Sequence, residues 1–355
     1  MEKNILILKD DRTGNFGQAQ AVGNIVTSYL KKRDIESRID IQEIKFRSKF
    51  AKSVLIFISA VAGKYIKGCH WCLRIFLKPE VYRSLVVKKP DVIISGGFSL
   101  AVVNAILSKE KLAKSIVVMK PPTLSLSSFN LAIIPRHDNP PKRENIVVTE
   151  GSLNLIDQDY LEKQTKALLS SSIIGSLSSG LCIGLLIGGD AKSFHLAAKD
   201  VSEVIKQIKS VLQNLGGDIL VTTSRRTPAD IEELVKKEFM GYDHCKLLVI
   251  ANEKNIPETV GAILGLSEIV VISPESIMMI SEAVNSKKYV LTFESEGLSR
   301  KHKRFLHYFA KNKYIYLTAP SGLGQMIRDI KLNKPEVHIP SKNNLLITEA
   351  LSKIL

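Results

Sequence analysis

The chain has 355 residues, of which 45% are hydrophobic and 24% charged, a globular composition long enough for two domains of about 150–180 residues. Its four cysteines lie in apolar or irregularly spaced contexts, which favours a reducing compartment over a disulfide scaffold, and its first residues are too charged for a signal peptide. No stretch approaches the roughly 20 apolar residues needed to span a bilayer, so the sequence predicts a cytoplasmic protein, soluble or peripheral to a membrane.

The first part of the chain alternates short hydrophobic runs with helical patterns. These runs are rich in Val, Ile and Leu without polar alternation, as in parallel strands that are buried on both faces. We predict strands at 4–10, 37–44, 91–97, 114–120, 130–135 and 145–151, and helices at 17–33 and 99–110.

Residues 45–89 carry much of the net charge of +15, with eleven Lys and Arg against a single acid, Glu80. Large apolar residues, among them Phe50, Phe57 and Trp71, lie between the basic ones. This mixture is typical of short helices on an anionic membrane surface, where each Lys or Arg contributes about 1 kcal/mol. The alternative is a solvated basic face over ordinary core helices. No nucleic-acid-binding motif is present, so we expect no nucleic-acid partner.

The same segment contains the motif C-H-W-C from Cys69 to Cys72. A zinc site needs four ligands, and His70 with two cysteines leaves one ligand missing. We therefore predict no metal site and interpret these cysteines as helix-packing residues.

The second part of the chain repeats the first pattern after a Ser- and Gly-rich stretch at 166–180, which predicts a linker. Thr227 as a cap, Pro228 and the acids that follow are typical of a helix start. We predict strands at 182–188, 218–223, 246–252, 268–273, 289–293 and 314–318, and helices near 196–214, 228–239, 257–265, 276–286, 301–312 and 322–331.

This order predicts an α/β protein with two doubly wound, Rossmann-like domains. The first domain is expected at 1–165 and the second at 181–335. A tail and helix at 336–355 follow the second domain, and we expect the helix to cross back onto the first.

Functional residues are expected where strands end, because ligands of open parallel sheets bind beyond the carboxyl ends of the strands. Gly188 and Gly189 end one strand, and their free N–H groups could cradle a phosphate beside Lys192. Ser224, Arg225 and Arg226 end the next strand, and Arg suits phosphate.

A third loop supplies Ser276 at a helix start and Glu282 further along that helix. Glu275 and Glu282 are seven residues apart and are predicted to share one helical face, where a carboxylate can accept the hydroxyls of a ribose. A polar fourth loop at 293–304 follows another strand. Each feature has a structural alternative, but together they indicate a nucleoside-diphosphate site.

Seven strings in this chain resemble the mitochondrial-fission "elongated mitochondria" family, whose bacterial members are regarded as glycosyltransferases. They are DDRTGNFGQ (10–18), ISGGFS (94–99), PRHD (135–138), TEGSLN (149–154), LIGGDAKSF (186–194), TTSRRTP (222–228) and SPESIMMISEA (273–283). The resemblance implies a GT-B architecture, in which two Rossmann-like domains face each other across a cleft. The nucleotide-sugar donor then binds to the C-terminal domain and the acceptor to the N-terminal one.

Site residues follow from the resemblance by position. Those implied for the donor are Gly188, Gly189, Ser224, Arg225, Ser276 and Glu282, and those facing the acceptor are Asp10, Arg12, Asn15, Gln18, His137 and Asp138. Two positions depart from the family pattern: Glu275 replaces a shorter Asp, and Met278 replaces a small polar residue. These departures leave the identity of the donor open.

Glycosyl transfer needs a base for the acceptor hydroxyl and positive charge for the departing diphosphate. GT-B enzymes need no essential metal, and the nucleotide-sugar is a substrate, so no cofactor is expected. We favour Asp10 as the base, with His137 or Asp138 as the alternative.

The leading hypothesis is a GT-B glycosyltransferase on the cytoplasmic face of a membrane, acting on a lipid-linked acceptor or an envelope glycan such as lipopolysaccharide. The alternative is a non-catalytic membrane adaptor, like the eukaryotic relatives that help to recruit a fission dynamin. The sugar, the nucleotide base, the stereochemistry and the oligomeric state stay open.

Overall fold

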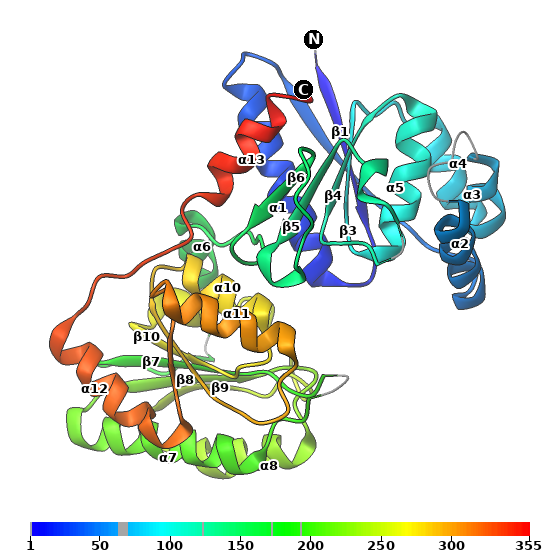
Figure 1. Cartoon of the computed structure of the whole chain (residues 1–355). Coiled ribbons are helices and arrows are strands. Elements are labelled where there is room, and N and C mark those ends of the chain that lie inside the picture. Colours follow the sequence, from blue (N-terminus) through cyan, green and yellow to red (C-terminus); the bar gives the residue numbers. More distant parts are fainter. Residues whose placement is uncertain (1, 63–69, 123, 172, 192–193) are drawn as a thin grey trace. The chain divides into compact units, whose positions relative to one another are not determined.

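The computed structural model describes residues 2–62, 70–122, 124–171, 173–191 and 194–355 (Figure 1). The chain forms two compact units. Unit 1 comprises Met1–Leu155 and Ser341–Leu355, and unit 2 comprises Ile156–Pro340. Each unit contains a parallel six-stranded sheet with helices on both faces, so the predicted fold class is confirmed.

The sheet of unit 1 has the strand order β2-β1-β3-β4-β5-β6. Its central strands are buried on both faces, which explains their continuous Val and Ile runs. The strands are β1 (Lys3–Lys9), β2 (Ser37–Glu43), β3 (Val92–Gly96), β4 (Lys114–Val118), β5 (Leu131–Pro135) and β6 (Ile146–Thr149).

Two hydrophobic cores cover the two faces of this sheet. Ile5 and Ile7 of β1 join one core, whereas Leu6 and Leu8 join the other, as the alternation of side chains along a strand requires. The helices are α1 (Thr13–Lys31), α2 (Lys49–Ala62), α3 (His70–Phe76), α4 (Pro79–Val87), α5 (Phe98–Lys111) and α13 (Asn343–Leu351), with short 3₁₀ turns η2 (Leu126–Ser128) and η3 (Arg136–Asp138).

The last helix, α13, returns to unit 1 as predicted. It contacts α1, β5 and β6, and its Ile347 and Leu351 are fully buried in the core on the α1 side. The end of the chain is therefore part of the first unit's core.

The sheet of unit 2 has the order β12-β11-β10-β7-β8-β9. Its strands are β7 (Cys182–Ile187), β8 (Asp218–Thr223), β9 (Cys245–Val249), β10 (Ile269–Ile272), β11 (Tyr289–Phe293) and β12 (Tyr316–Thr318). The helices are α6 (Gln158–Leu169), α7 (Ala198–Leu215), α8 (Ala229–Phe239), α9 (Thr259–Leu266), α10 (Ile277–Asn285), α11 (Arg300–Lys311) and α12 (Leu323–Asn333), with a 3₁₀ turn η4 (Pro320–Gly322).

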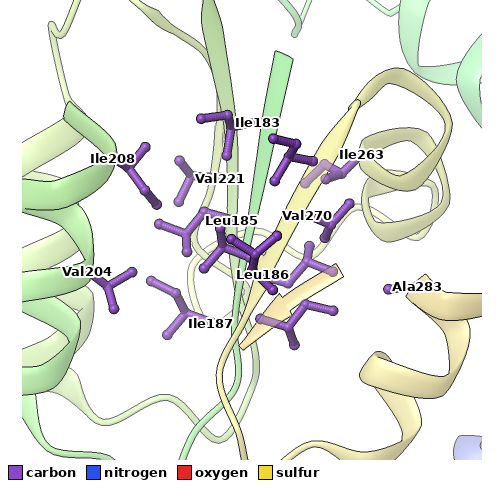
Figure 2. Packing of buried hydrophobic residues seen from close by; sticks show 14 of the residues in the cluster. Ile183, Leu185, Leu186, Ile187, Val204, Ile208, Val221, Ile263, Val270 and Ala283 are labelled. Carbon is purple, nitrogen blue, oxygen red and sulfur yellow. The ribbon is translucent and has the colours of Figure 1, made fainter. Parts of the chain in front are cut away.

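Strand β7 lies at the centre of the unit 2 core (Figure 2). Figure 2 shows Val204 and Ile208 of α7 to one side of this strand and Ile263 of α9 to the other. Gly184 of β7 faces α9, because a Cβ there would lie 2.5 Å from the Ile263 side chain. The central strand is thus covered by helices on both faces.

The chain reverses its strand order once in each sheet. After β2 the chain crosses β1 to form β3 on the other side, and after β9 it returns to form β10 beside β7. Such a reversal opens a crevice beyond the carboxyl ends of the two strands, which is where open α/β sheets bind ligands. The candidate positions are therefore the ends of β1 and β3 in unit 1, and of β7 and β10 in unit 2.

The observed boundary between the units follows Leu155, ten residues before the predicted domain boundary at 165. The predicted linker at 166–180 lies inside unit 2 and overlaps the end of helix α6. Helix α6 belongs to unit 2 because it packs across α9, where Gly261 and Gly265 leave no room for a Cβ next to Gln164 and Thr165. Part of the Ser- and Gly-rich stretch is also fixed within unit 2, since the Gly175 amide donates to the Lys246 carbonyl at 2.8 Å.

The cysteines of unit 1 also need a correction. Cys72 of α3 is disulfide-bonded, so it is more than a helix-packing residue, whereas Cys69 lies outside the described residues. In unit 2, Cys182 and Cys245 are free thiols, and burial raises the pKa of each to about 11.

Candidate functional site

Both amides of the predicted phosphate loop are already hydrogen-bonded within unit 2. Gly188 and Gly189 follow β7, and the turn from Ser273 to Ser276 follows β10, at the reversal of the sheet. The Gly188 N–H donates to Ser273 Oγ at 2.7 Å, and the Gly189 N–H donates to Glu275 Oε1 at 2.8 Å. The expectation that these N–H groups are free for a phosphate is therefore wrong for this conformation.

The glycines are required by the close approach of the protein's own chain. A Cβ at Gly188 would lie 1.7 Å from Glu275 Oε1, and one at Gly189 would lie 2.0 Å from the Arg226 carbonyl oxygen. Any side chain at either position would push apart the loops that follow β7, β8 and β10.

Glu275 lies in the turn before α10, not on one helical face with Glu282 as predicted, because the helix begins at Ile277. Its side chain is buried, with the residue 4% exposed, and Oε2 has no hydrogen-bond partner among the described residues. Burial raises the pKa of Glu275, although hydrogen bonds from the Gly189 amide, its own amide and Ser273, and the charge of Arg226, oppose the rise.

Gly188, Gly189 and Asp190 form the loop after β7, called the glycine loop below. The arginine that contacts this loop is Arg226. Its carbonyl accepts from the Asp190 N–H at 3.1 Å, and its guanidinium donates to the Asp190 carbonyl at 3.2 Å. Arg226 and Arg225, the predicted donor-binding residue, are both exposed. Ser224 lies in the same turn, where its Oγ accepts from the Arg226 N–H at 3.1 Å.

Thr227 holds this turn against the glycine loop instead of capping α8 as predicted. Its hydroxyl donates to the Gly188 carbonyl and accepts from the Ser224 N–H at 2.9 Å. Pro228 takes the cap position of α8, without a side-chain hydrogen bond.

Asp190 closes the loop after the glycines. Its carboxylate bonds His195 Nδ1 at 2.7 Å and accepts from the Leu196 N–H at 3.0 Å. Burial acts against ionisation here, but these hydrogen bonds outweigh it, so the pKa of Asp190 lies below its usual value. The predicted cation of this loop, Lys192, lies outside the described residues.

His302 of α11 belongs to the same neighbourhood, although the sequence pattern did not single it out. Its Nδ1 shares a hydrogen bond of 2.7 Å with Ser299 Oγ, and the ring also hydrogen-bonds the Glu275 backbone. Burial lowers the pKa of His302, and the charges of Lys301 and Arg226 lower it further. The sequence feature that could have indicated His302 was the polar loop predicted at 293–304, which contains it.

Ser276 and Glu282 stand at different depths along α10. Ser276 occupies the N-cap position and is buried, whereas Glu282 lies six residues later, about 9 Å along the helix axis. Burial raises the pKa of Glu282 to about 7, and its charge raises the pKa of Tyr160 on α6. The Glu282 carboxyl therefore lies near α6, away from the glycine loop.

In unit 1, Asp10 lies directly after β1, at the reversal of the sheet. The residue is 6% exposed, and its Oδ1 accepts from the Arg12 N–H at 3.1 Å. Burial raises the pKa of Asp10 and Asp11 adds to the rise, whereas the Arg12 amide and the charges of Lys52 and Arg12 oppose it. Asp10 is therefore a buried carboxyl with nearby cations.

Asn15 and Gln18 of α1 approach the ends of the neighbouring strands. A Cβ at Gly96 would lie 2.2 Å from the Asn15 carbonyl oxygen, so Asn15 sits directly against the end of β3. Gln18 is buried, and its Nε2 lies 3.4 Å from the sulfur of Met119, which follows β4. The predicted acceptor-side residues of α1 thus line the same sheet edge as Asp10.

His137 and Asp138 form the 3₁₀ turn η3 after β5, where His137 is buried. In the strand order, β3 and β4 separate β5 from β1. Three inter-strand spacings place these residues about 14 Å from Asp10. Asp10 and His137 therefore cannot act on the same proton, and the two proposed bases define two different sites.

Solved structures of low sequence identity share this fold. The UDP-GlcNAc 2-epimerase of Methanocaldococcus jannaschii is 14% identical, with 99% of this chain and 100% of that chain covered and a TM-score of 0.62. Its complex with UDP-GlcNAc and UDP is matched at 13% identity, 100% and 99% coverage and a TM-score of 0.52. Staphylococcus aureus MnaA with UDP is matched at 11% identity, 98% and 91% coverage and a TM-score of 0.50.

These likenesses show that the fold is GT-B-like. No curated protein matches the chain significantly. The sequence profile described as "Mitochondrial fission ELM1" matches residues 14–333, which is most of the chain. The chain therefore belongs to the mitochondrial fission ELM1 family, as the resemblance in its sequence indicates.

Proposed function

We propose that this protein is a metal-independent GT-B glycosyltransferase that takes its sugar from a nucleotide-sugar donor. The observation that carries the proposal is the group of polar residues at the reversal of the unit 2 sheet. Arg226 contacts the glycine loop, and Ser276 and His302 lie at the turn that accepts hydrogen bonds from the amides of that loop. The UDP and UDP-GlcNAc complexes of proteins with the same fold support a nucleotide-sugar as the ligand class.

In this proposal, positive charge in unit 2 stabilises the departing diphosphate, and a carboxylate takes the ribose. Arg226 and the N-terminus of α10 are the groups suited to phosphate, and Glu282 is the carboxylate proposed for the ribose hydroxyls. Unit 1 then provides the acceptor side, where Asp10 is the proposed base, and Arg12, Asn15 and Gln18 are the proposed acceptor contacts.

The proposed acceptor is a lipid-linked or envelope glycan at an anionic membrane surface. Support comes from α2, where Phe50, Phe57 and Val61 are 77%, 69% and 74% exposed. They are seven and four residues apart and share one face of the helix. In the part of the chain that the structure describes, no helix has the length and apolarity needed to cross a membrane.

The alternative function is a non-catalytic membrane adaptor. One observation favours it: the hydrogen bonds to Ser273 and Glu275 explain both glycines of the loop without any ligand. An adaptor and an enzyme therefore differ in whether the unit 2 edge binds a nucleotide-sugar at all.

A binding experiment separates the two. Isothermal titration of the purified protein against UDP-, GDP-, CMP- and ADP-sugars should give saturable binding for one nucleotide class. Arg226→Ala should weaken that binding at least tenfold, because a charged hydrogen-bond donor to phosphate is lost. Arg225→Ala is the matched control in the same turn and should change it less. Failure of every nucleotide-sugar to bind would favour the adaptor.

A further inference from the structure

Glu275 places a buried carboxyl at the amide where a phosphate would meet the glycine loop. Its Oε1 accepts from the Gly189 N–H at 2.8 Å, the geometry of a charge-assisted hydrogen bond to an anion. The loop is at the reversal of the sheet, beside the N-terminus of α10. Both features suit an anion, and the protein itself supplies one.

The second oxygen of this carboxyl is unsatisfied. Glu275 Oε2 is buried and has no hydrogen-bond partner among the described residues. A buried carboxylate oxygen without a partner is unfavourable, so a carboxylate with only structural duties would be expected to have both oxygens bonded. The unbonded oxygen suits a Glu275 side chain that can leave the Gly189 amide.

We propose that Glu275 is an internal anion that a ligand phosphate replaces at the Gly189 amide, so that phosphate binds there only after this carboxylate is neutralised or displaced. The inference deepens the proposed function, since the phosphate would be part of the donor diphosphate. Glu275 is then a residue that controls access to the loop.

The charge of Glu275 opposes the binding of a phosphate at the Gly189 amide. A phosphate and an ionised carboxylate cannot share one amide, because like charges at contact distance repel. Among the described residues, the titratable and charged groups near Glu275 include Arg226 from the β8–α8 loop, His302 and Lys301 from α11, and the Asp190–His195 pair from the β7–α7 loop. Only removal of the Glu275 charge eliminates the competitor while leaving the attractive Arg226 in place.

Two variants test this with inorganic pyrophosphate as the probe. Glu275→Gln keeps the shape and removes the charge, and Glu275→Ala removes the competing group altogether. Both should bind pyrophosphate at least tenfold more tightly than the wild type at neutral pH, as measured by isothermal titration. Glu294→Gln is the matched control, because Glu294 is an exposed acid after β11 on the same edge of the sheet, and it should have a smaller effect.

The pH dependence provides a second readout. Lower pH neutralises Glu275, so the advantage of Glu275→Gln over the wild type should shrink as the solution is acidified. The ratio of the two affinities cancels the protonation of free pyrophosphate, which is the same for both proteins. In glycine-labelled protein, the Gly189 amide resonance should shift with pH in the wild type and shift less in Glu275→Gln.

The outcomes separate this inference from the proposed function. Equal pyrophosphate affinity in the wild type and both Glu275 variants, including no binding by any, overturns the inference even if nucleotide-sugars bind. Tighter pyrophosphate binding by the variants, with no nucleotide-sugar bound by any protein, supports the inference and rejects the glycosyltransferase. Thermal unfolding of each variant shows that the comparison concerns folded protein.

Discussion

Asp10 combines the properties that a proton-transferring carboxyl needs in this fold. It follows the first strand at the reversal of its sheet, it is buried, and burial raises its pKa. A raised pKa brings a carboxyl closer to the working pH, where it can accept and release a proton.

We expect Asp10→Asn to lower the transfer rate by about 10²–10⁴-fold, because the amide keeps the shape but cannot take the proton. Donor affinity should remain unchanged, since the donor site is assigned to unit 2. Steady-state kinetics together with donor titration measures both quantities.

His137→Ala and Asp138→Asn test the alternative base. Because the ends of β1 and β5 are about 14 Å apart, one of the two positions can contact the reacting hydroxyl and the other cannot. Near-normal turnover of Asp10→Asn with an inactive His137→Ala would move the base to the turn after β5.

Glu282 makes the stability of unit 2 depend on pH. Burial raises its pKa from 4.5 to about 7, so the folded state holds this proton more tightly than the unfolded state does between these values. The free energy of unfolding therefore falls as the pH rises through this window, by at most about 3 kcal/mol.

Glu282→Gln should remove this dependence. The variant should match the wild type near pH 4.5 and be more stable than it at pH 8, as urea unfolding at the two pH values can measure. A variant that is less stable than the wild type at pH 8 would show that the charged carboxylate has a favourable partner.

The positions of the candidate site residues could be predicted from the sequence better than the hydrogen bonds between them. The strand-end rule located Gly188, Ser224 and Ser276 correctly at one edge, because the order of hydrophobic runs defines where parallel strands end. The hydrogen bond from Gly189 to Glu275 joins loops 86 residues apart, and no local pattern encodes such a pair. Which arginine of the 224–227 turn contacts the glycine loop likewise depends on how that turn packs against Asp190.

At the scale of single elements, α2 has an exposed apolar row where a globular protein normally places polar residues. Phe50, Phe57 and Val61 form this row, and Lys49 and Lys52 lie on the same helix. Apolar contact and positive charge together are the two signals that hold a helix on an anionic membrane.

The triple variant Phe50→Ser, Phe57→Ser, Val61→Ser should lose binding to vesicles that contain anionic lipid by 100-fold or more, since burying each large apolar side chain contributes about 1.5–3 kcal/mol. Co-sedimentation at low salt measures this, and binding of the wild type should weaken as salt screens the charges. Leu332→Ser is the matched control, because Leu332 is 82% exposed on α12, which belongs to unit 2. Unchanged binding of the triple variant would reject α2 as the contact.

The predicted elements show where local patterns suffice. Continuous Val and Ile runs identified the buried strands, whose parallel pairing requires cover on both faces. Helix α6 was absent from the predicted elements, although Asp157 caps it by accepting from the Tyr160 N–H at 2.8 Å. Its buried face contains only Leu161 and Leu168, so the hydrophobic period is too sparse to recognise without the partner helix α9.

At the scale of the whole molecule, the last residues of the chain complete the first unit. Ile347 and Leu351 of α13 are fully buried against α1 and the edge of the unit 1 sheet. We expect Ile347→Ala to destabilise unit 1 by about 2–5 kcal/mol, because the deletion leaves a cavity in a packed core.

Hydrogen exchange can localise that effect. Amides of α1 and β6 should exchange faster in Ile347→Ala, whereas those of β7 and β8 in unit 2 should keep their wild-type rates. Leu345→Ala on the same helix is the control, because Leu345 is 60% exposed and its truncation leaves no cavity. Uniform acceleration in both units would mean that the two units unfold together.

The chain's division into units was harder to predict than its fold. Composition pointed to the Ser- and Gly-rich stretch at 166–180 as a linker, but the Gly175 and Ser178 amides are hydrogen-bonded inside unit 2. The observed boundary at Leu155 has no such compositional mark. It is set by which helix α6 packs on, and that is a property of the tertiary structure.

The packing of α6 on α9 has a consequence for how this sequence can diverge. Gly261 and Gly265 lie one helical turn apart, and a Cβ at Gly265 would lie 2.2 Å from Thr165 Oγ1. A larger residue at 265 therefore becomes acceptable only when position 165 loses its side-chain volume, so these two sites should evolve as a compensating pair. A lineage that altered one alone would pass through a less stable intermediate, and that barrier should keep the pair of glycines while the neighbouring loops drift.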